Sequence, residues 1–176
     1  MSSCRQRFLC DEMLARLGRW LRAAGYDVVI AAPGEGDKTL LQQARSEQRM
    51  MLSRDRKLLE YRDAAAIVSL LSANQLHGQL EELSNNFSID WLCCPFSRCL
   101  VCNSVLIPAS SEVIARVPRE ALREDETVLY CSSCDQPYWH GSHVRRMRQQ
   151  LDNFSRGVWN ASVEDDAMLL INEKIK

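Results

Sequence analysis

Short apolar runs alternate with stretches of helical periodicity over residues 7–92, and this alternation most constrains the fold. The runs RFLC, YDVVIA, RMMLS and AAIVSLL read as strands, and each is followed by a segment with apolar residues every three or four positions. Strands that alternate with helices of this length form right-handed β-α-β units. The sequence therefore predicts an α/β domain with a parallel sheet.

The expected helices of this domain are bounded by cap and turn signals. Helical periodicity follows Asp11 and stops at Gly25, a residue type that favours helix C-termini. Further helices are expected after Asp37, after Asp55 and over roughly residues 73–86.

The residue pattern of the sequence changes after residue 92. From Cys99 to Cys134 the helical period fades, and two C-x-x-C pairs, CLVC and CSSC, stand 28 residues apart. We expect three segments: an α/β domain over 1–92, a small β-rich module over 93–150, and a tail of unknown structure over 151–176. Within the tail, AMLLINEKI could form a short strand or helix.

The two pairs, Cys99 with Cys102 and Cys131 with Cys134, indicate a zinc site. Each C-x-x-C knuckle offers two thiolates, and two knuckles complete a tetrahedral Zn²⁺ site with no open position, so the zinc would be structural. A redox pair or an iron–sulfur cluster also uses such pairs, but the usual surroundings of either are missing. Four cysteines remain, and we interpret them as small apolar residues of the core: Cys4, Cys10, Cys93 and Cys94.

Three aspartates, Asp11, Asp37 and Asp55, lie at or just after the end of a predicted strand, and each opens a helix. Each could be only a cap, because an Asp carboxylate accepts hydrogen bonds from the first helical turn. However, the carboxyl ends of parallel strands share one edge of the sheet, where ligands bind. Three carboxylates there would repel one another unless a cation lay between them, and hard oxygen ligands suit Mg²⁺ or Mn²⁺. The pattern favours a metal site that could activate water against a phosphodiester.

Arginines accompany these acids. Arg16, Arg19 and Arg22 are spaced three apart on the first expected helix; a solvated helix face explains such a stripe, and that is our interpretation of Arg22. Arg16 and Arg19, nearer to Asp11, and Arg54, beside Asp55, could bind phosphates close to the metal. Ser53 either orients a ligand or merely ends a strand.

Charge and composition restrict the partners. The net charge is −1, so any contact with nucleic acid must come from a local arrangement of arginines. The first ten residues lack an apolar core of signal-peptide length, and no run approaches the length of a membrane span. We therefore expect a cytoplasmic protein with no membrane partner, whose cysteines are reduced or bound to metal.

Three stretches, in this order, resemble the Mut-seven C-terminal RNase domain family: FLCDEMLARLGRWLRAAGYD, MLSRDRKLL, and CLVCNSVL followed by CSSCDQPYWHGSHVRRM. The resemblance covers about residues 7–148 and implies a PIN-like, three-layer α/β/α fold followed by a zinc ribbon. By position it implies acidic site residues at Asp11, Asp37 and Asp55, a Ser-x-Asp motif at Ser53, and zinc ligands at the four paired cysteines. PIN nucleases usually present a fourth acid, for which Asp63 is the candidate here.

The sequence thus predicts a metal-dependent ribonuclease that uses Mg²⁺ or Mn²⁺ to hydrolyse RNA, with single-stranded RNA as the substrate that the PIN relation implies. The alternative is a non-catalytic RNA- or protein-binding module in which the aspartates only cap helices. The missing fourth acid and the neutral net charge favour that alternative. A metal-dependent phosphatase is a weaker interpretation, because no nucleophilic-aspartate loop is recognisable.

Overall fold

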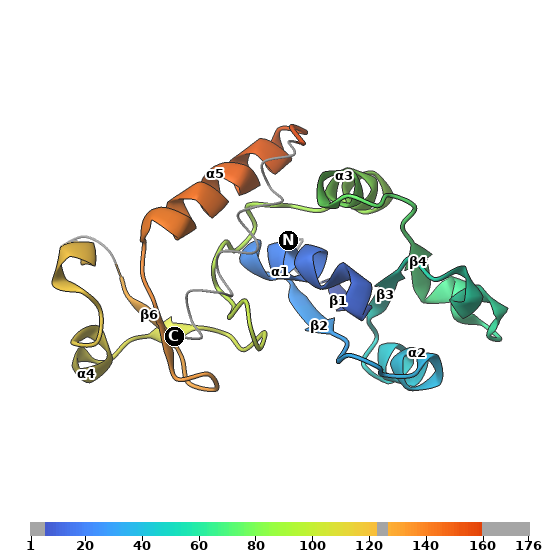
Figure 1. The fold of residues 1–176 in the computed structure, drawn as a ribbon, viewed down its shortest axis with the longest axis horizontal. Helices are drawn as coiled ribbons and strands as arrows, with labels where there is room; N and C mark the ends of the chain where they lie inside the picture. The colour runs from blue at the N-terminus through green and yellow to red at the C-terminus, as the bar shows by residue number, and fades with distance from the viewer. Residues whose placement is uncertain (1–5, 123–126, 160–176) are drawn as a thin grey trace.

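A four-stranded parallel sheet forms the centre of the first unit (Figure 1). The structure is a computed structural model that describes residues 6–122 and 127–159. The strands are β1 (Arg7–Cys10), β2 (Asp27–Ile30), β3 (Met50–Ser53) and β4 (Val68–Leu70), in the spatial order β2-β1-β3-β4. Leu9 of β1 lies between Val29 of β2 and Met51 of β3. The predicted α/β fold with a parallel sheet is confirmed.

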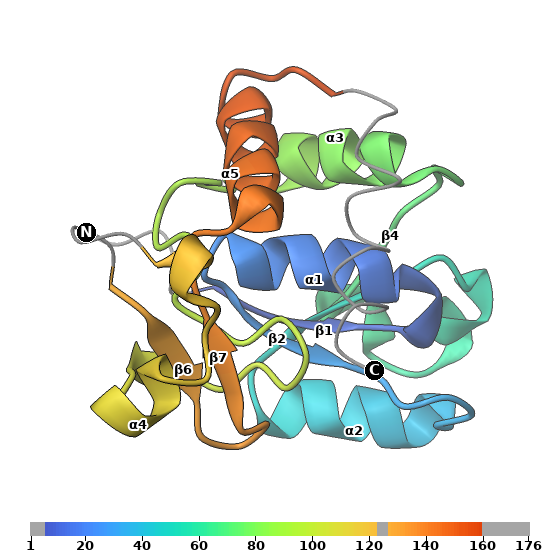
Figure 2. The same ribbon diagram turned by 60° about the vertical axis from the view of Figure 1, so that its left-hand side comes forward.

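Helices cover both faces of this sheet. Figure 2 shows α1 (Ala15–Ala23) on one side of the strands and α2 (Asp37–Ser46) on the other, with α3 (Leu76–Asn86) beyond α1. Alternate residues of β1 supply the two cores, because successive strand side chains point to opposite faces. Phe8 packs in the cluster that contains the buried residues of α1 and α3, whereas Leu9 packs in the cluster that contains those of α2.

The order of the strands creates a switch point between β1 and β3. The chain leaves β1 through α1 to reach β2, and then crosses the opposite face through α2 to reach β3. In open α/β sheets, ligands bind outside the carboxyl ends of strands at such a point. Asp11 directly follows β1, and Asp55 lies two residues after the end of β3. The topology therefore positions these two acids at the place where a site is expected.

The end of α1 is built as the sequence predicts. Gly25 has φ +99°, and the N–H groups of Gly25 and Tyr26 donate to the carbonyls of Arg22 at 3.0 Å and Leu21 at 2.9 Å. This is the bonding of a glycine-terminated helix. A Cβ atom at Gly25 would lie 2.3 Å from the carbonyl oxygen of Cys94, so the position also needs glycine for space.

The segment after β3 is less regular than the sequence predicts. The expected helix is a 3₁₀ helix, η3 (Arg56–Glu60), and part of the expected strand AAIVSLL is a second 3₁₀ helix, η4 (Ala64–Ala66). Asp63 between them has a left-handed φ of +61°. Alanine is a poor strand former, so the strand begins only after the alanines, at Val68. Similarly, α3 begins at Leu76 and not at residue 73.

The second unit contains a three-stranded antiparallel sheet of β5 (Ile107–Pro108), β6 (Leu129–Cys131) and β7 (Gln136–Tyr138). Two short elements, α4 (Ser111–Ile114) and η5 (Arg119–Ala121), lie between β5 and β6. The antiparallel arrangement agrees with the β-rich module expected after residue 92.

Helix α5 (Ser142–Ser155) starts in the segment expected as the ribbon and ends beyond residue 150. Its buried residues belong to the core of the first unit, where the Phe154 ring lies 5.2 Å from Trp20 and 5.3 Å from Trp91 between centroids. The stretch AMLLINEKI lies outside the described residues. Of the helices that the structure describes, none combines the length and the apolar character needed to cross a membrane.

Candidate functional site

A chain of hydrogen bonds joins the carboxyl ends of β1 and β3. Ser53, the last residue of β3, is fully buried. Its hydroxyl donates to Oδ2 of Asp11 at 2.6 Å and accepts from the N–H of Asp55 at 3.1 Å. Ser53 therefore fixes one acid through its carboxylate and the other through its backbone.

The structure shows which of the three aspartates cap a helix with their side chains. Asp55 caps η3, because its Oδ1 accepts from the N–H of Lys57 at 2.9 Å. Asp11 precedes η2 (Glu12–Leu14) and makes no side-chain cap bond. Asp37 is the first residue of α2, where Gly36 occupies the cap position and no side-chain bond is made. Of the three aspartates, only Asp55 has a side chain whose position is explained by helix capping.

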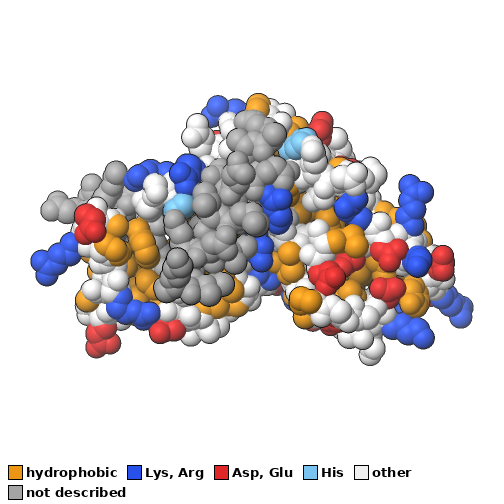
Figure 3. All heavy atoms as spheres, in the orientation of Figure 1, with side chains coloured by type: hydrophobic (Ala, Val, Ile, Leu, Met, Phe, Trp, Pro, Cys, Tyr) orange, Lys and Arg blue, Asp and Glu red, His pale blue; other side chains and the backbone are white. Residues whose placement is uncertain are grey.

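The loop that leads to Asp37 is attached to the same edge. Oε2 of Glu12 accepts from the N–H of Gly34 at 3.0 Å, which connects the first turn after β1 with the loop between β2 and α2. Figure 3 shows acidic side chains gathered on this face, with Lys and Arg at its margins. The carboxylates of Asp11, Asp37 and Asp55 do not meet around one point. In the described part of the chain, the ribbon cysteines are the only group of three or more potential metal ligands that lie close enough together to hold one ion.

The arginines that the sequence analysis assigns to phosphate binding lie on α1 and directly after β3. Arg16 and Arg19 are half-buried on α1. Burial, together with the neighbouring Arg16 charge, lowers the pKa of Arg19. Arg54 donates from Nη2 to Oδ1 of Asn74, which holds its guanidinium toward the loop after β4.

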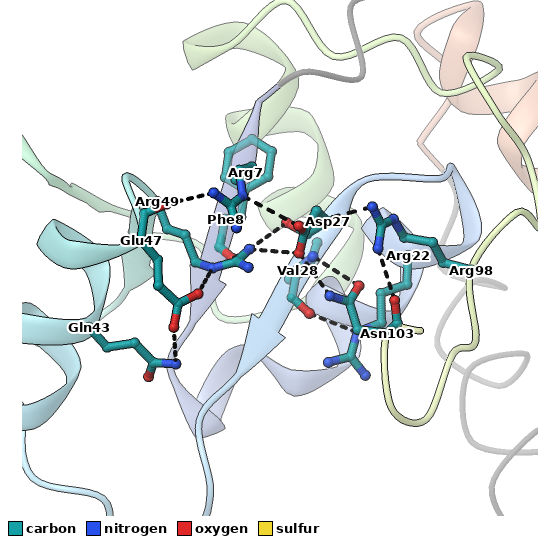
Figure 4. Close-up of polar contacts among 10 residues, drawn as sticks. All are labelled: Arg7, Phe8, Arg22, Asp27, Val28, Gln43, Glu47, Arg49, Arg98 and Asn103. Atoms are coloured by element: carbon teal, nitrogen blue, oxygen red, sulfur yellow. Dashed lines mark hydrogen bonds and ion pairs between the residues drawn. The ribbon is translucent and has the colours of Figure 1, made fainter. Parts of the chain in front are cut away.

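The interpretation of Arg22 as a solvated residue is wrong. Arg22 is 5% exposed, and its Nε donates to the carbonyl of Val28 at 2.9 Å (Figure 4). Its Nη1 donates to the carbonyls of Leu100 at 3.0 Å and Val101 at 2.7 Å. Leu100 and Val101 lie between the first two paired cysteines, so Arg22 attaches the first knuckle to α1.

Asp27 is a second contact between the units that sequence reasoning missed. It lies at the amino end of β2, where its carboxylate accepts from Nη1 of Arg49 at 2.7 Å and Nδ2 of Asn103 at 2.8 Å (Figure 4). Burial raises the pKa of Asp27, but the hydrogen bonds from Arg49 and Asn103 outweigh it and lower the pKa to about 2. Asn103 also accepts from the N–H of Val28 at 3.0 Å. These partners are too distant in sequence for local patterns to reveal.

The four paired cysteines lie together, as the sequence predicts. The sulfur atoms of Cys99, Cys102, Cys131 and Cys134 are all within 4.8 Å of one another. The sulfurs of Cys99 and Cys134 are 3.8 Å apart, and those of Cys102 and Cys131 are 3.4 Å apart. The hydroxyl of Tyr138 lies 3.1 Å from the sulfur of Cys99. The cluster is positioned to hold a metal ion.

Among the thiols of the cluster, the pKa shifts differ in direction. Burial and the neighbouring thiols raise the pKa of Cys134 and, less strongly, that of Cys131. Cys102 differs, because hydrogen bonds with Ser104 overcome the effect of burial and lower its pKa to about 6. Four thiolates this close repel one another unless a cation compensates their charge.

The remaining cysteines follow the prediction only in part. Cys10 is fully buried, as expected, and burial raises its pKa to about 12. Cys94 is exposed, so its assignment to the core is wrong. Cys93 is half-buried and disulfide-bonded, which contradicts both its expected core position and its expected reduced state. Cys4 lies outside the described residues.

Comparison with known proteins assigns this chain to a family. A family model described as the Mut7-C RNAse domain matches residues 6–151. The chain belongs to the Mut7-C RNAse domain family. This match confirms the resemblance read from the three sequence stretches, and it covers both the acidic edge of the sheet and the cysteine cluster. Neither the curated proteins nor the solved structures gave a match.

Proposed function

We propose that this member of the Mut7-C family is a metal-dependent ribonuclease that hydrolyses RNA phosphodiester bonds at the carboxyl edge of the parallel sheet. The observation that carries the proposal is the Asp11–Ser53–Asp55 chain at the switch point between β1 and β3. The family description, which is that of an RNase domain, supports the same reaction class.

Asp11, Asp37 and Asp55 would hold Mg²⁺ or Mn²⁺. Their carboxylate oxygens are the hard ligands that these ions prefer, and the side chains of Asp11 and Asp37 are not used as helix caps. Without a cation, three such carboxylates repel one another, which fits their separation in this structure. When bound, the ion would lower the pKa of an attacking water and neutralise charge on the phosphate.

The chain's own residues would prepare this site. Ser53 holds Oδ2 of Asp11 by a hydrogen bond, and the backbone of Asp55 is held by the same hydroxyl. Arg16 and Arg19 on α1 and Arg54 after β3 would bind phosphate oxygens of a single-stranded RNA. A guanidinium suits this task because it stays charged and donates several hydrogen bonds in one plane.

The cysteine cluster would hold a structural Zn²⁺. Four thiolates arranged tetrahedrally at about 2.3 Å from zinc are separated from one another by about 3.8 Å. The sulfur–sulfur separations of 3.8 Å and 3.4 Å in the structure fit this geometry. Four protein ligands leave no open position for water, so this ion would fold the ribbon and take no part in hydrolysis.

Replacement of Asp55 tests the proposal. Asp55→Asn keeps the oxygen that caps η3 but removes the charge that would bind the cation. We expect Mn²⁺-dependent cleavage of a generic single-stranded RNA to fall at least about 100-fold, since a catalytic metal contributes several kcal/mol. The free energy of unfolding should change by less than about 0.5 kcal/mol. Asp152→Asn, on α5, is the matched control and should retain activity.

A non-catalytic binding module is the second candidate, and two observations favour it. Asp55 does act as a cap, and Asp63, the candidate fourth acid, is 78% exposed and lies 3.7 Å from Arg62. If this alternative holds, Asp55→Asn leaves any activity unchanged, whereas Asp55→Ala costs about 1 kcal/mol of stability through the lost cap. Full cleavage by Asp55→Asn would therefore refute the ribonuclease site proposed here.

A further inference from the structure

A groove of about 700 Å³ lies between α2 and the segment that follows β3. One wall is a stripe of α2 that includes Lys38, Leu41 and Arg45, and the other wall is formed by Tyr61 and Arg62. Residues 38, 41 and 45 are spaced three and four apart, so they lie on one face of the helix. Lys38 and Arg45 are two turns apart, or about 10 Å along the helix axis.

The groove is positively charged. Lys38, Arg45 and Arg62 contribute to its lining, and no acidic side chain of the described residues does. Nη2 of Arg45 donates to the carbonyl of Arg62 at 2.5 Å, so this bond joins the two walls without neutralising the charge. Asp63, which is not part of the lining, lies 3.7 Å from Arg62 in a pair that is almost fully exposed and therefore weak.

In a neighbouring cavity, by comparison, two arginines are paired with carboxylates. It measures about 460 Å³ and shares Arg45 with the groove, but its other arginines are Arg7 and Arg49. Both of these are paired with Asp27, and Arg49 is also paired with Glu47 at 2.5 Å. In the groove, by contrast, Lys38 and Arg45 have no carboxylate partner among the described side chains. The groove thus carries a charge that an anionic ligand would neutralise.

Both walls start at the proposed metal ligands. Helix α2 begins at Asp37, directly before Lys38, and η3 is capped by Asp55, six residues before Tyr61. The groove therefore extends away from the acidic edge of the sheet along the side of α2 that carries Lys38, Leu41 and Arg45. A polymer bound at that edge has a path between these two walls.

We propose that this groove binds single-stranded RNA, a step that rests on the proposed ribonuclease function and gives its substrate a path to the acidic edge. Phosphates would contact Lys38, Arg45 and Arg62, and a base would stack on Tyr61. Tyr61 is half-buried against the core cluster beneath α2, which fixes the ring while it lines the groove. Single strands offer both a charged backbone and unstacked bases, whereas a duplex keeps its bases stacked and paired.

Binding is measured by fluorescence anisotropy with a short labelled oligouridylate, without added Mg²⁺ or Mn²⁺, so that cleavage does not interfere. In the double variant Lys38→Gln/Arg45→Gln, the negative slope of log K against log salt should become shallower by about 1.4, or about 0.7 per lost phosphate contact. Tyr61→Leu should weaken binding by roughly 5- to 150-fold without changing the slope, because stacking is not an ionic contact. Arg156→Gln, at the far end of α5, removes one positive charge outside the groove; as the control, it should leave the slope unchanged.

Tyr61→Phe keeps the ring and should retain the wild-type affinity, which separates stacking from a general loss of fold. An unchanged slope in the double variant, or equal binding of polyglutamate at the same residues, would overturn the RNA groove. Cleavage is assayed separately with Mn²⁺. If the variants bind RNA more weakly than the wild type, but the wild type does not cleave RNA, the RNA-binding proposal is supported and the ribonuclease proposal is refuted. If the wild type cleaves RNA and the variants bind and cleave it equally well, only the RNA-binding proposal is refuted.

Discussion

The hydroxyl of Ser53 contacts both Asp11 and Asp55, so one buried oxygen atom organises the proposed site. Ser53→Ala leaves the N–H of Asp55 without its acceptor and Asp11 without its donor. A buried polar group left unsatisfied costs about 1–3 kcal/mol, so we expect a loss of stability of that size together with reduced cleavage. Urea unfolding followed by tryptophan fluorescence measures the first effect, and the Mn²⁺ assay measures the second.

Ser69→Ala provides the comparison for Ser53. Ser69 lies in the neighbouring strand β4, is half-buried, and pairs in register with Leu52. No side-chain hydrogen bond of Ser69 occurs among the described residues, so its replacement should change stability by less than about 0.5 kcal/mol. Equal behaviour of the two variants would show that the Ser53 hydroxyl does not organise the site.

Asp27 gives the protein a predictable acid sensitivity. Its pKa is about 2 in the folded state, below the value of about 3.9 for an unfolded chain, so folding is favoured while the carboxylate is charged. This contribution is complete above about pH 5 and is lost as the pH falls through about 2. The side chain is 20% exposed, and the shift corresponds to about 2 kcal/mol.

The variant Asp27→Asn should therefore be less stable than the wild type by about 2 kcal/mol at pH 7, and the difference should vanish near pH 2. Urea unfolding at a series of pH values measures it. Asp63→Asn is the control, because the Asp63 side chain is 78% exposed. The difference in free energy of unfolding between this variant and the wild type should be the same at every pH. A pH-independent difference for Asp27→Asn would mean that the carboxylate is not held by its charged partners.

At the scale of elements, the sequence predicts what local patterns determine. The helix that ends at Gly25 follows from apolar spacing and a glycine stop, and the strands follow from short apolar runs. Asp11 and Asp55 could be assigned to one sheet edge because parallel topology alone brings the ends of strands together. The cluster of four cysteines was predictable because each knuckle is a local motif.

Features made by distant partners were not predictable. Arg22 looks like a member of an exposed stripe, and its acceptors at Leu100 and Val101 lie 78 and 79 residues away. Helix α5 did leave a signal, because Met147, Leu151 and Phe154 recur at helical spacing. What the sequence could not reveal is that this face packs on Trp20 and Trp91 of the first unit.

At the scale of the whole molecule, the first cysteine knuckle serves the two units at once. It supplies Cys99 and Cys102 to the cysteine cluster, and the carbonyls between them accept both Nη1 hydrogen bonds of Arg22. Asn103, the next residue, bonds to the backbone of Val28 and to Asp27. The interface therefore requires a folded knuckle, and the binding energy of a structural zinc is folding energy.

If the cluster holds zinc as proposed, loss of the metal should also lower the stability of the first unit. We expect purified wild-type protein to carry about one zinc per chain and Cys99→Ser to carry almost none. Without an ordered knuckle, the buried guanidinium of Arg22 loses two of its three carbonyl acceptors, which is costly for a desolvated charge. Amide hydrogen exchange should accelerate in Cys99→Ser both after residue 93 and in β2. Cys94→Ser, which replaces an exposed cysteine outside the cluster, should keep its zinc and its protection. If exchange in β2 stays at the wild-type rate while zinc is absent, the two units are energetically independent and the contacts of Arg22 do not couple them.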